Sequence, residues 1–323
     1  SVVLPGELAD MGQQVSGRVQ FHDFHPALSD FRQEVLDGLA SERKQIAPKF
    51  FYDQRGSELF ELITRLPEYY PTRVEMQLLH RHGPEMAQLL GQGSALLELG
   101  SGSSRKIRIL LNALKPRIYL PVDISRQHLM ESAGAIASDF PEMDVQAVCA
   151  DFTRELRLPD LPGNPVLTAF FPGSSIGNFK PQEGVLLMQR LAGRLGPGGQ
   201  LLIGVDLKKD PEIIEAAYND RQQITAAFNL NLLERINREL GADFDLNAFR
   251  HYACYNSGAG RVEMHLRSTR QQRVRVDGQE FHFDAGETLH TENSYKYTPE
   301  EFIRLAAEAG YESTAVWVCL LYT

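Results

Sequence analysis

Acidic side chains follow three successive apolar runs, at positions where they could bind a nucleoside. Glu98 lies near the end of the first run, Asp123 ends the second, and Asp151 directly follows the third, with Phe152 next to it. A carboxylate accepts hydrogen bonds from ribose hydroxyls or an exocyclic amino group, and a phenyl ring can stack on a base. The pattern therefore predicts that Asp123 binds a ribose and that Asp151 and Phe152 bind adenine.

The loop after the first run narrows the choice of nucleoside. Gly100 and Gly102 allow the backbone to come close to a ligand. A dinucleotide site would need a third glycine at position 105, which is Arg105, so we expect no cradle for a pyrophosphate. Lys106 either contacts a ligand carboxylate or lies on a helix surface. S-adenosyl-L-methionine is therefore the predicted cofactor.

The segment that follows the fourth apolar run carries a candidate for the acceptor site. Its sequence over residues 170–179 is FFPGSSIGNF, which includes Asn178. An asparagine amide accepts a hydrogen bond from an amine and donates one to a carboxylate, which suits a zwitterionic substrate. Asn178 could instead cap a helix that begins near Pro181. Both interpretations stand at this point.

These residues need a scaffold that brings the ends of the runs together. Between residues 94 and 207, apolar runs alternate with helical patterns. We expect strands at 95–99, 118–124, 145–150, 166–171 and 201–206, and helices at 105–114, 126–139 and 181–195. This alternation predicts an α/β fold with right-handed βαβ units and a doubly wound parallel sheet. Such sheets bind ligands beyond the carboxyl ends of their strands, where the acids would meet.

The flanking segments have a different pattern. We expect helices at 29–60, 212–239 and 300–309, short strands at 262–266, 272–276, 280–283 and 288–295, and a final strand at 313–321. Residues 315–322 contain no turn residue, which indicates either a truncated closing hairpin or residues missing between Val318 and Cys319. The predicted domains are 74–207 plus 297–323 for the cofactor, and 15–73 plus 208–296, an α+β domain, for the substrate.

Composition limits the partners. The chain has 323 residues, 43% of them hydrophobic, and a formal net charge of −9, which would repel a nucleic-acid backbone. No apolar run approaches the roughly 20 residues that cross a bilayer, and residues 1–14 lack the pattern of a secretory signal. Cys149, Cys254 and Cys319 and the nine scattered histidines show no metal-ligand spacing. We expect a cytoplasmic monomer that acts on a small molecule and needs no metal.

Longer motifs resemble the histidine-specific Nα-methyltransferase family. The most specific part lies between residues 51 and 73, in the segments FYD, GSELF and ITRLPEYYPTR, and the resemblance extends over residues 30–309. Further matches fall at 98–102, 173–178, 237–240, 243–245, 262–264, 283–287 and 291–294. That family makes hercynine, the trimethyl betaine of histidine, on the route to ergothioneine. The resemblance implies a class I methyltransferase fold, a Rossmann-like doubly wound sheet with a second substrate-binding domain.

The resemblance also implies a role for individual residues. Tyr52 and Asn178 would hold the α-amino group of histidine, with Tyr52 or an ordered water as the relay for its proton. Tyr218 and Asn178 would bind the carboxylate. Glu292 would accept the imidazole N–H, and the Ser294 hydroxyl would donate to the other ring nitrogen. The remaining predicted residues line the ring pocket (Phe60, Thr225 and Met264) or bind the cofactor (Tyr69, Gly100, Gly102, Lys106, Asp123, Asp151 and Phe152).

Three other interpretations remain open. The same chemistry could act on tryptophan, although indole has no acceptor nitrogen for Ser294 and needs more room beside Met264. A nicotinamide-dependent oxidoreductase would share the sheet, but the glycine missing at position 105 and the pair Asp151-Phe152 argue against it. A binding protein without catalytic activity would keep the cofactor pocket, yet none of the motifs is degraded.

Overall fold

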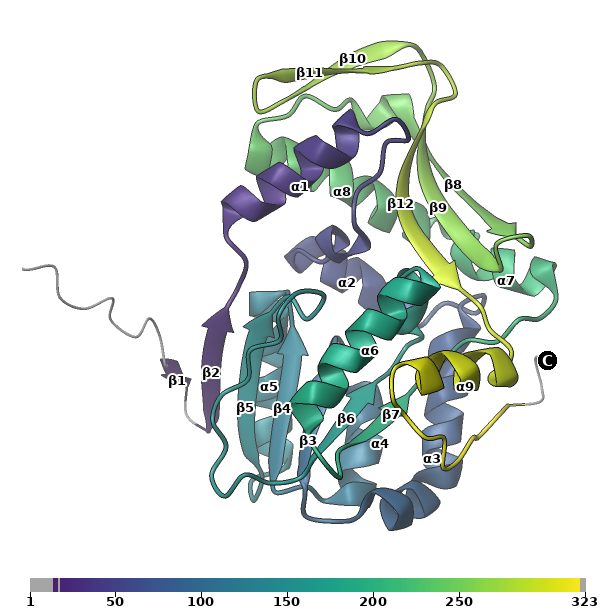
Figure 1. The fold of residues 1–323 in the computed structure, drawn as a ribbon. Helices are drawn as coiled ribbons and strands as arrows, with labels where there is room; N and C mark the ends of the chain where they lie inside the picture. Colours follow the sequence, from purple (N-terminus) through teal and green to yellow (C-terminus); the bar gives the residue numbers. More distant parts are fainter. Residues whose placement is uncertain (1–13, 17, 320–323) are drawn as a thin grey trace, which may run out of the picture.

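The computed structural model describes residues 14–16 and 18–319 of the chain. Within these residues, a seven-stranded sheet has the order β1-β2-β5-β4-β3-β6-β7 (Figure 1). β2 through β7 pair in parallel, and only β1 is antiparallel to its neighbour. The strands are β1 (Gln14–Ser16), β2 (Val19–Phe24), β3 (Ala95–Leu99), β4 (Ile118–Asp123), β5 (Asp144–Ala150), β6 (Leu167–Phe171) and β7 (Gln200–Ile203).

Helices cover both faces of this sheet (Figure 1). One face packs against α3 (Tyr70–Leu90), α4 (Arg105–Leu114) and α5 (Arg126–Asp139), and the other against α6 (Pro181–Leu195) and α9 (Pro299–Glu308). The central strands β3 to β6 are almost entirely buried, which explains why they are continuous apolar runs rather than alternating ones. The predicted doubly wound sheet is confirmed.

The strand order fixes where a ligand can bind. β3 lies between β4 and β6, so the chain leaves β3 toward one side of the sheet and returns on the other through β6. At such a switch point the loops after neighbouring strands diverge and leave a crevice beyond the carboxyl ends. The loops 100–104 and 172–178 border this crevice.

A second layer stands above the carboxyl edge of the sheet (Figure 1). It contains the antiparallel sheet β12-β9-β8 and the separate hairpin β10-β11. Its strands are β8 (Phe249–Asn256), β9 (Arg261–Ser268), β10 (Gln272–Val276), β11 (Gln279–Phe283) and β12 (Thr288–Tyr295). Its helices are α1 (Leu28–Ala40), η1 (Pro48–Phe51), α2 (Gln54–Ile63), α7 (Pro211–Tyr218), α8 (Ile224–Leu240) and η3 (Leu246–Ala248).

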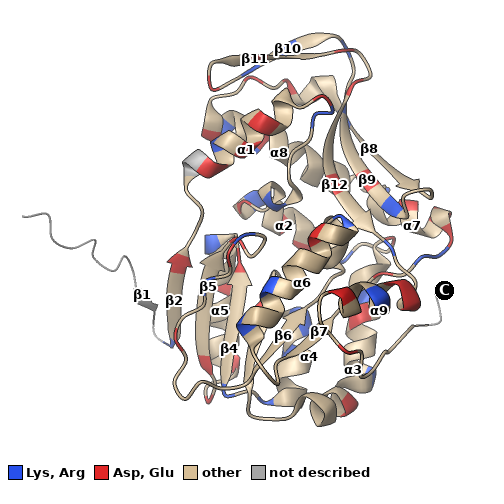
Figure 2. Ribbon diagram, in the orientation of Figure 1, with Lys and Arg blue, Asp and Glu red and all other residues tan. Residues whose placement is uncertain are grey.

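The layer has a hydrophobic core of its own, separate from the two cores that flank the large sheet. We propose that the chain forms two domains that correspond to these cores. The boundary differs from the predicted one in the segment 15–73, because β2 pairs in parallel with β5 and buries Val19 and Phe21 against the large sheet. Lys and Arg are interspersed with Asp and Glu over both layers (Figure 2).

Some predicted elements differ from the structure. The segment expected to be helical at 29–60 contains α1, η1 and α2 with non-helical residues between them. The helix expected at 212–239 is broken into α7 and α8, because the Asp220 carboxylate accepts the backbone N–H groups of Ile224 and Thr225, both at 2.9 Å, and starts a new helix. The strand expected at 313–321 is absent over residues 313–319, where the Trp317 indole donates to Glu85 of α3 at 3.0 Å. Residues 320–321 lie outside the described part of the chain.

No helix within 14–16 and 18–319 has both the length and the apolar character that crossing a bilayer requires.

Candidate active site

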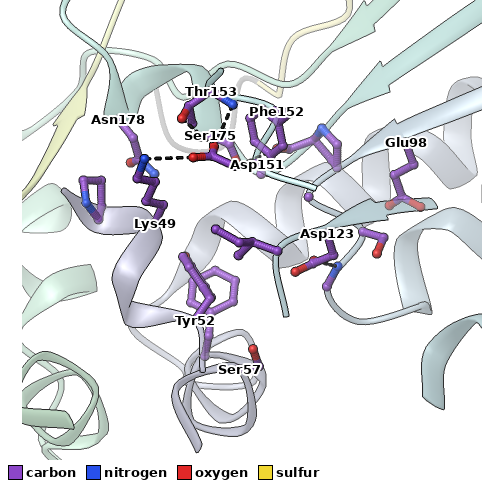
Figure 3. Close-up of a pocket in the computed structure, with 18 of the residues that line it drawn as sticks. Lys49, Tyr52, Ser57, Glu98, Asp123, Asp151, Phe152, Thr153, Ser175 and Asn178 are labelled. Atoms are coloured by element: carbon purple, nitrogen blue, oxygen red, sulfur yellow. Dashed lines mark hydrogen bonds and ion pairs between the residues drawn. The ribbon is translucent and has the colours of Figure 1, made fainter. Parts of the chain in front are cut away.

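A cavity of about 470 Å³ lies at the carboxyl edge of the large sheet, lined also by residues of η1 and α2. Figure 3 shows residues that line it. Its size is typical of a small-molecule site, for which pockets are roughly 300–1,000 Å³. The walls contain all the residues predicted to bind the cofactor: Tyr69, Gly100, Gly102, Lys106, Asp123, Asp151 and Phe152. They also contain Tyr52, Phe60 and Asn178 from the predicted acceptor site.

The glycine loop is shaped as a cradle. Gly100 and Gly102 have φ values of 69° and 44°, in the left-handed region that favours glycine. The Gly102 N–H donates to Oδ2 of Asp123 at 3.0 Å, and the Ser125 N–H donates to Oδ1 at 2.9 Å. These bonds fix the carboxylate and leave it further lone pairs for ligand hydroxyls. The buried Ser101 hydroxyl lines the same cavity and has no partner among the described residues.

Asp151 is held from two directions. Thr153 donates to Oδ1 through its backbone N–H at 2.9 Å, and the Lys49 ammonium donates to Oδ2 at 2.8 Å (Figure 3). Burial acts to raise the pKa of Asp151, but these bonds outweigh it and hold the pKa below its usual value. Asp151 is therefore ionised, and Phe152 beside it packs edge-on against Phe171 at 5.5 Å between ring centres.

Lys106 lies in the cavity wall but is already paired. Its ammonium is 2.6 Å from the Glu75 carboxylate, which also accepts the Gly173 N–H at 2.9 Å. The pair thus joins the start of α4 to the loop after β6, close to Asn178 in the same wall. Lys49 and Glu75 were not predicted from the sequence, because one isolated Lys and one helical Glu carry no local signal.

The start of α6 decides between the two interpretations of Asn178. The helix begins at Pro181 with Lys180 as its N-cap residue, and no hydrogen bond from the described chain engages the Asn178 amide. Asn178 instead ends the short helix η2 (Ser175–Asn178) in the cavity wall. A Cβ atom on the preceding Gly177 would lie 2.8 Å from the Tyr295 carbonyl oxygen. Glycine at this position therefore lets η2 approach β12.

A β-bulge orients the two residues predicted to bind the imidazole. His290 pairs with His265 of β9, but the next pair is Glu292 with Met264, so Thr291 is the extra residue. A bulge reverses which face the following side chains occupy. Glu292 and Ser294 consequently share the face of Met264, which lies in the core of the second layer, and Asn293 lies on the opposite face.

Burial without a hydrogen-bond partner sets the ionisation of Glu292. Its carboxylate receives no hydrogen bond from any described residue, and it borders a second cavity, of about 420 Å³, that shares Asn178 with the first. Burial raises the pKa of Glu292 to about 7, against the opposing charge of Lys296. An unpaired carboxylate that is partly removed from water is costly unless a ligand supplies a donor.

Aromatic rings connect the cavity to these groups. Tyr52 packs edge-on against Phe60 at 5.7 Å between ring centres, and Tyr69 packs edge-on against Tyr218 at 6.2 Å. The Tyr218 hydroxyl lies 3.0 Å from the Ser294 hydroxyl. Of the predicted residues, Tyr218, Thr225, Met264 and Ser294 are buried and do not line this cavity, and Glu292 lines only the second one.

The structure also brings together a group that the sequence did not indicate. Ligand atoms of Glu263, His265 and His290 lie within 4.8 Å of one another, on the face of β9 and β12 opposite Glu292. Two of these side chains have other partners: Arg261 pairs with Glu263 at 3.1 Å, and Nε2 of His290 lies 3.0 Å from the Glu292 carbonyl oxygen. Nδ1 of His265 is buried and has no hydrogen-bond partner among the described residues.

The cradle, the acids at successive strand ends, among them the ionised Asp151, and the unpartnered Ser101 hydroxyl fit an adenosyl group with an attached amino acid. Together with the strand order, they define a class I methyltransferase that uses S-adenosyl-L-methionine.

Comparison with known proteins gives the family. Residues 31–319 match the family described as histidine-specific methyltransferase, SAM-dependent. The chain is 43% identical to a histidine N-alpha-methyltransferase of Mycolicibacterium smegmatis, over 90% of this chain and 92% of that protein. It is 27% identical to a 4-dimethylallyltryptophan N-methyltransferase of Claviceps purpurea, over 88% of this chain and 90% of that protein. The chain belongs to the histidine-specific, S-adenosylmethionine-dependent methyltransferase family.

Proposed function

We propose that the chain methylates the α-amino group of free L-histidine, up to the trimethyl betaine hercynine, on the route to ergothioneine. The observation that carries the choice of acceptor is the pair Glu292 and Ser294, which the bulge in β12 turns to one face. Their carboxylate and hydroxyl complement the N–H and the bare nitrogen of a neutral imidazole. A fungal relative, the ergothioneine biosynthesis protein 1 of Neurospora crassa, is 31% identical over 97% of this chain and 37% of its own length.

Binding of the cofactor would use the groups fixed at the sheet edge. Asp123 would accept the two ribose hydroxyls, Asp151 would accept the adenine amino group, and Phe152 would stack on the base. Gly100, Gly102 and Tyr69 would shape the path of the chain around the ligand. Lys106 would reach the methionine carboxylate while it stays paired with Glu75.

When bound, S-adenosyl-L-methionine would supply a methyl group activated by its sulfonium: an N–C bond would form to the amine as the C–S bond breaks and S-adenosylhomocysteine leaves. The chain's own contribution is alignment and exclusion of water. Burial, and next the charge of Glu292, raise the pKa of Tyr52 well above its usual value, so Tyr52 acts as a neutral phenol and not as a phenolate base. Its oxygen would accept an amine N–H while Asn178 holds the same nitrogen, and the proton lost from the ammonium would leave through water.

The acceptor can be tested by calorimetry. In the presence of S-adenosylhomocysteine, we expect wild-type protein to bind L-histidine and to discriminate against L-tryptophan by a factor on the order of 10⁴, because an indole leaves the Ser294 hydroxyl unpaired. Tryptophan binding without histidine binding would transfer the proposal to an indole acceptor, as in the Claviceps relative. Binding of neither would refute a free aromatic amino acid as the substrate.

A further inference from the structure

A buried lysine stands behind two of the side chains assigned to the substrate. Lys296 follows the last residue of β12, and its side chain is 0% exposed. Its ammonium lies 2.7 Å from Asp206, 2.9 Å from the Tyr218 hydroxyl and 3.0 Å from the Ser294 hydroxyl. An ammonium has three hydrogens and no acceptor, so these partners use all of its donors.

The surroundings keep this lysine charged. Burial acts to lower the pKa of Lys296, but Asp206 and Tyr218 outweigh it and hold the pKa above its usual value. Asp206 also pairs with Lys209 at 2.6 Å, and the Lys209 side chain is 4% exposed. The three charged groups therefore carry one excess positive charge, buried next to the proposed position of an anionic substrate group.

The hydrogen-bond directions around this lysine are fixed by its chemistry. Because Lys296 only donates, the oxygens of Tyr218 and Ser294 must accept from it. The two hydroxyl hydrogens are then left for other acceptors. The Tyr218 hydroxyl donates to the Ser294 oxygen at 3.0 Å. No described residue accepts the hydrogen of the Ser294 hydroxyl. Both hydrogens could turn to a ligand without loss of the bonds from Lys296.

We propose that Lys296 is a positioning and specificity-determining residue, which makes Tyr218 a donor to the substrate carboxylate and Ser294 a donor to the bare imidazole nitrogen. This inference rests on the proposed function, because it takes histidine as the ligand. Ser294 held as a donor rejects a ring that offers an N–H at that point, and Glu292 accepts the N–H on the other side. The excess positive charge behind Tyr218 favours a carboxylate over a neutral group there.

Replacement of the lysine leaves its ion-pair partner satisfied. In Lys296→Met, Asp206 keeps the bond from Lys209, and the Tyr70 hydroxyl still donates to it at 2.5 Å. We expect the affinity for L-histidine, measured calorimetrically with S-adenosylhomocysteine present, to fall on the order of 100-fold. The affinity for S-adenosylhomocysteine itself should stay within about 2-fold of wild type, because Lys296 is not in the wall of the cofactor cavity. Lys208→Met removes a neighbouring surface lysine and should change neither affinity.

A double-mutant cycle separates positioning from a purely structural role. If Lys296 acts through Ser294, the losses in Lys296→Met and Ser294→Ala should be clearly less than additive in the double variant. Additive losses, or a parallel loss of S-adenosylhomocysteine binding, would overturn the inference. Should Lys296→Met not fold, Lys296→Arg keeps the charge and the pair with Asp206 but not the tetrahedral geometry. That variant should bind histidine at least about 10-fold more weakly, and wild-type affinity would overturn the inference.

The wild-type titration separates the two proposals. Histidine binding by wild type with no effect of either Lys296 substitution would refute the role of the lysine and leave the proposed function intact. Failure of wild type to bind histidine would refute both.

Discussion

Glu292→Ala is expected to remove detectable histidine binding while the protein still binds S-adenosylhomocysteine. The carboxylate has no hydrogen-bond partner in the described part of the chain, so an imidazole N–H would be its first donor. Loss of a half-buried charged acceptor from a polar site lowers affinity by a factor on the order of 10² to 10⁴. Calorimetry on wild type, Glu292→Ala and the exposed-helix control Glu234→Ala measures this directly, and unchanged histidine affinity in Glu292→Ala would contradict the assignment.

The same residue should show opposite effects on binding and stability. Burial raises the pKa of Glu292 to about 7 in the folded protein, above its ordinary value of 4.5. The free energy of unfolding therefore decreases as the pH rises from 4.5 through about 7, because the folded state resists ionisation of this carboxyl. Glu292→Gln should therefore stabilise the unliganded protein at pH 8, by about 1–3 kcal/mol, and should have little effect near pH 4.5. Denaturant unfolding at the two pH values provides the measurement. Destabilisation at pH 8 would indicate that Glu292 is a structural residue.

Asn178→Ala is expected to lower kcat/KM for histidine by a factor on the order of 10² to 10³, because the amide would hold both the reacting nitrogen and the carboxylate. The amide makes no hydrogen bond within the described chain, so its removal should leave the melting temperature nearly unchanged. Steady-state kinetics with histidine and S-adenosyl-L-methionine test this expectation.

Two further variants complete the test of Asn178. Asn178→Asp keeps the acceptor for the amine but repels the substrate carboxylate, so its loss should be mainly in KM for histidine. Asn112→Ala removes an exposed amide from α4 and should behave as wild type. If Asn178→Ala had the same kcat/KM as wild type, Asn178 would not bind the substrate.

The cofactor half of the site follows from the sequence because its signals are local. Each of the central strands β3 to β6 is a largely apolar run, and the topology of parallel sheets places the residues after those runs at one edge. Asp123, Asp151 and the loop with Gly100 and Gly102 are therefore found together in the cavity wall, as predicted.

The acceptor half depends on features that no local pattern reveals. Strict alternation along β12 would place Glu292 and Ser294 on the face of His290, away from the core; the bulge at Thr291 reverses this. The Thr291 hydroxyl donates to Asn229 of α8 at 2.8 Å, a contact between residues 62 positions apart in the chain. Family resemblance could indicate the two residues, but only the tertiary structure gives their direction.

Charged residues brought in from distant segments were missed for the same reason. Lys49 reaches Asp151 from 102 positions away, and Lys296 meets Asp206 and Tyr218 from separate loops and helices. Within the sequence, each is a single lysine beside an aromatic residue, with no spacing that marks it as part of a site. The broken helix at Asp220 and the pairing of β2 with β5 also depend on contacts rather than on periodicity.

The central claim is that the α-amino nitrogen of histidine receives the methyl groups. The most direct test is to incubate the protein with L-histidine and S-adenosyl-L-methionine labelled with deuterium in its methyl group, and to locate the label by fragmentation mass spectrometry. The account predicts a product that carries three labelled methyl groups, all on the α-nitrogen and none on the imidazole. Label on a ring nitrogen, or no labelled histidine while another amino acid is methylated, would contradict it.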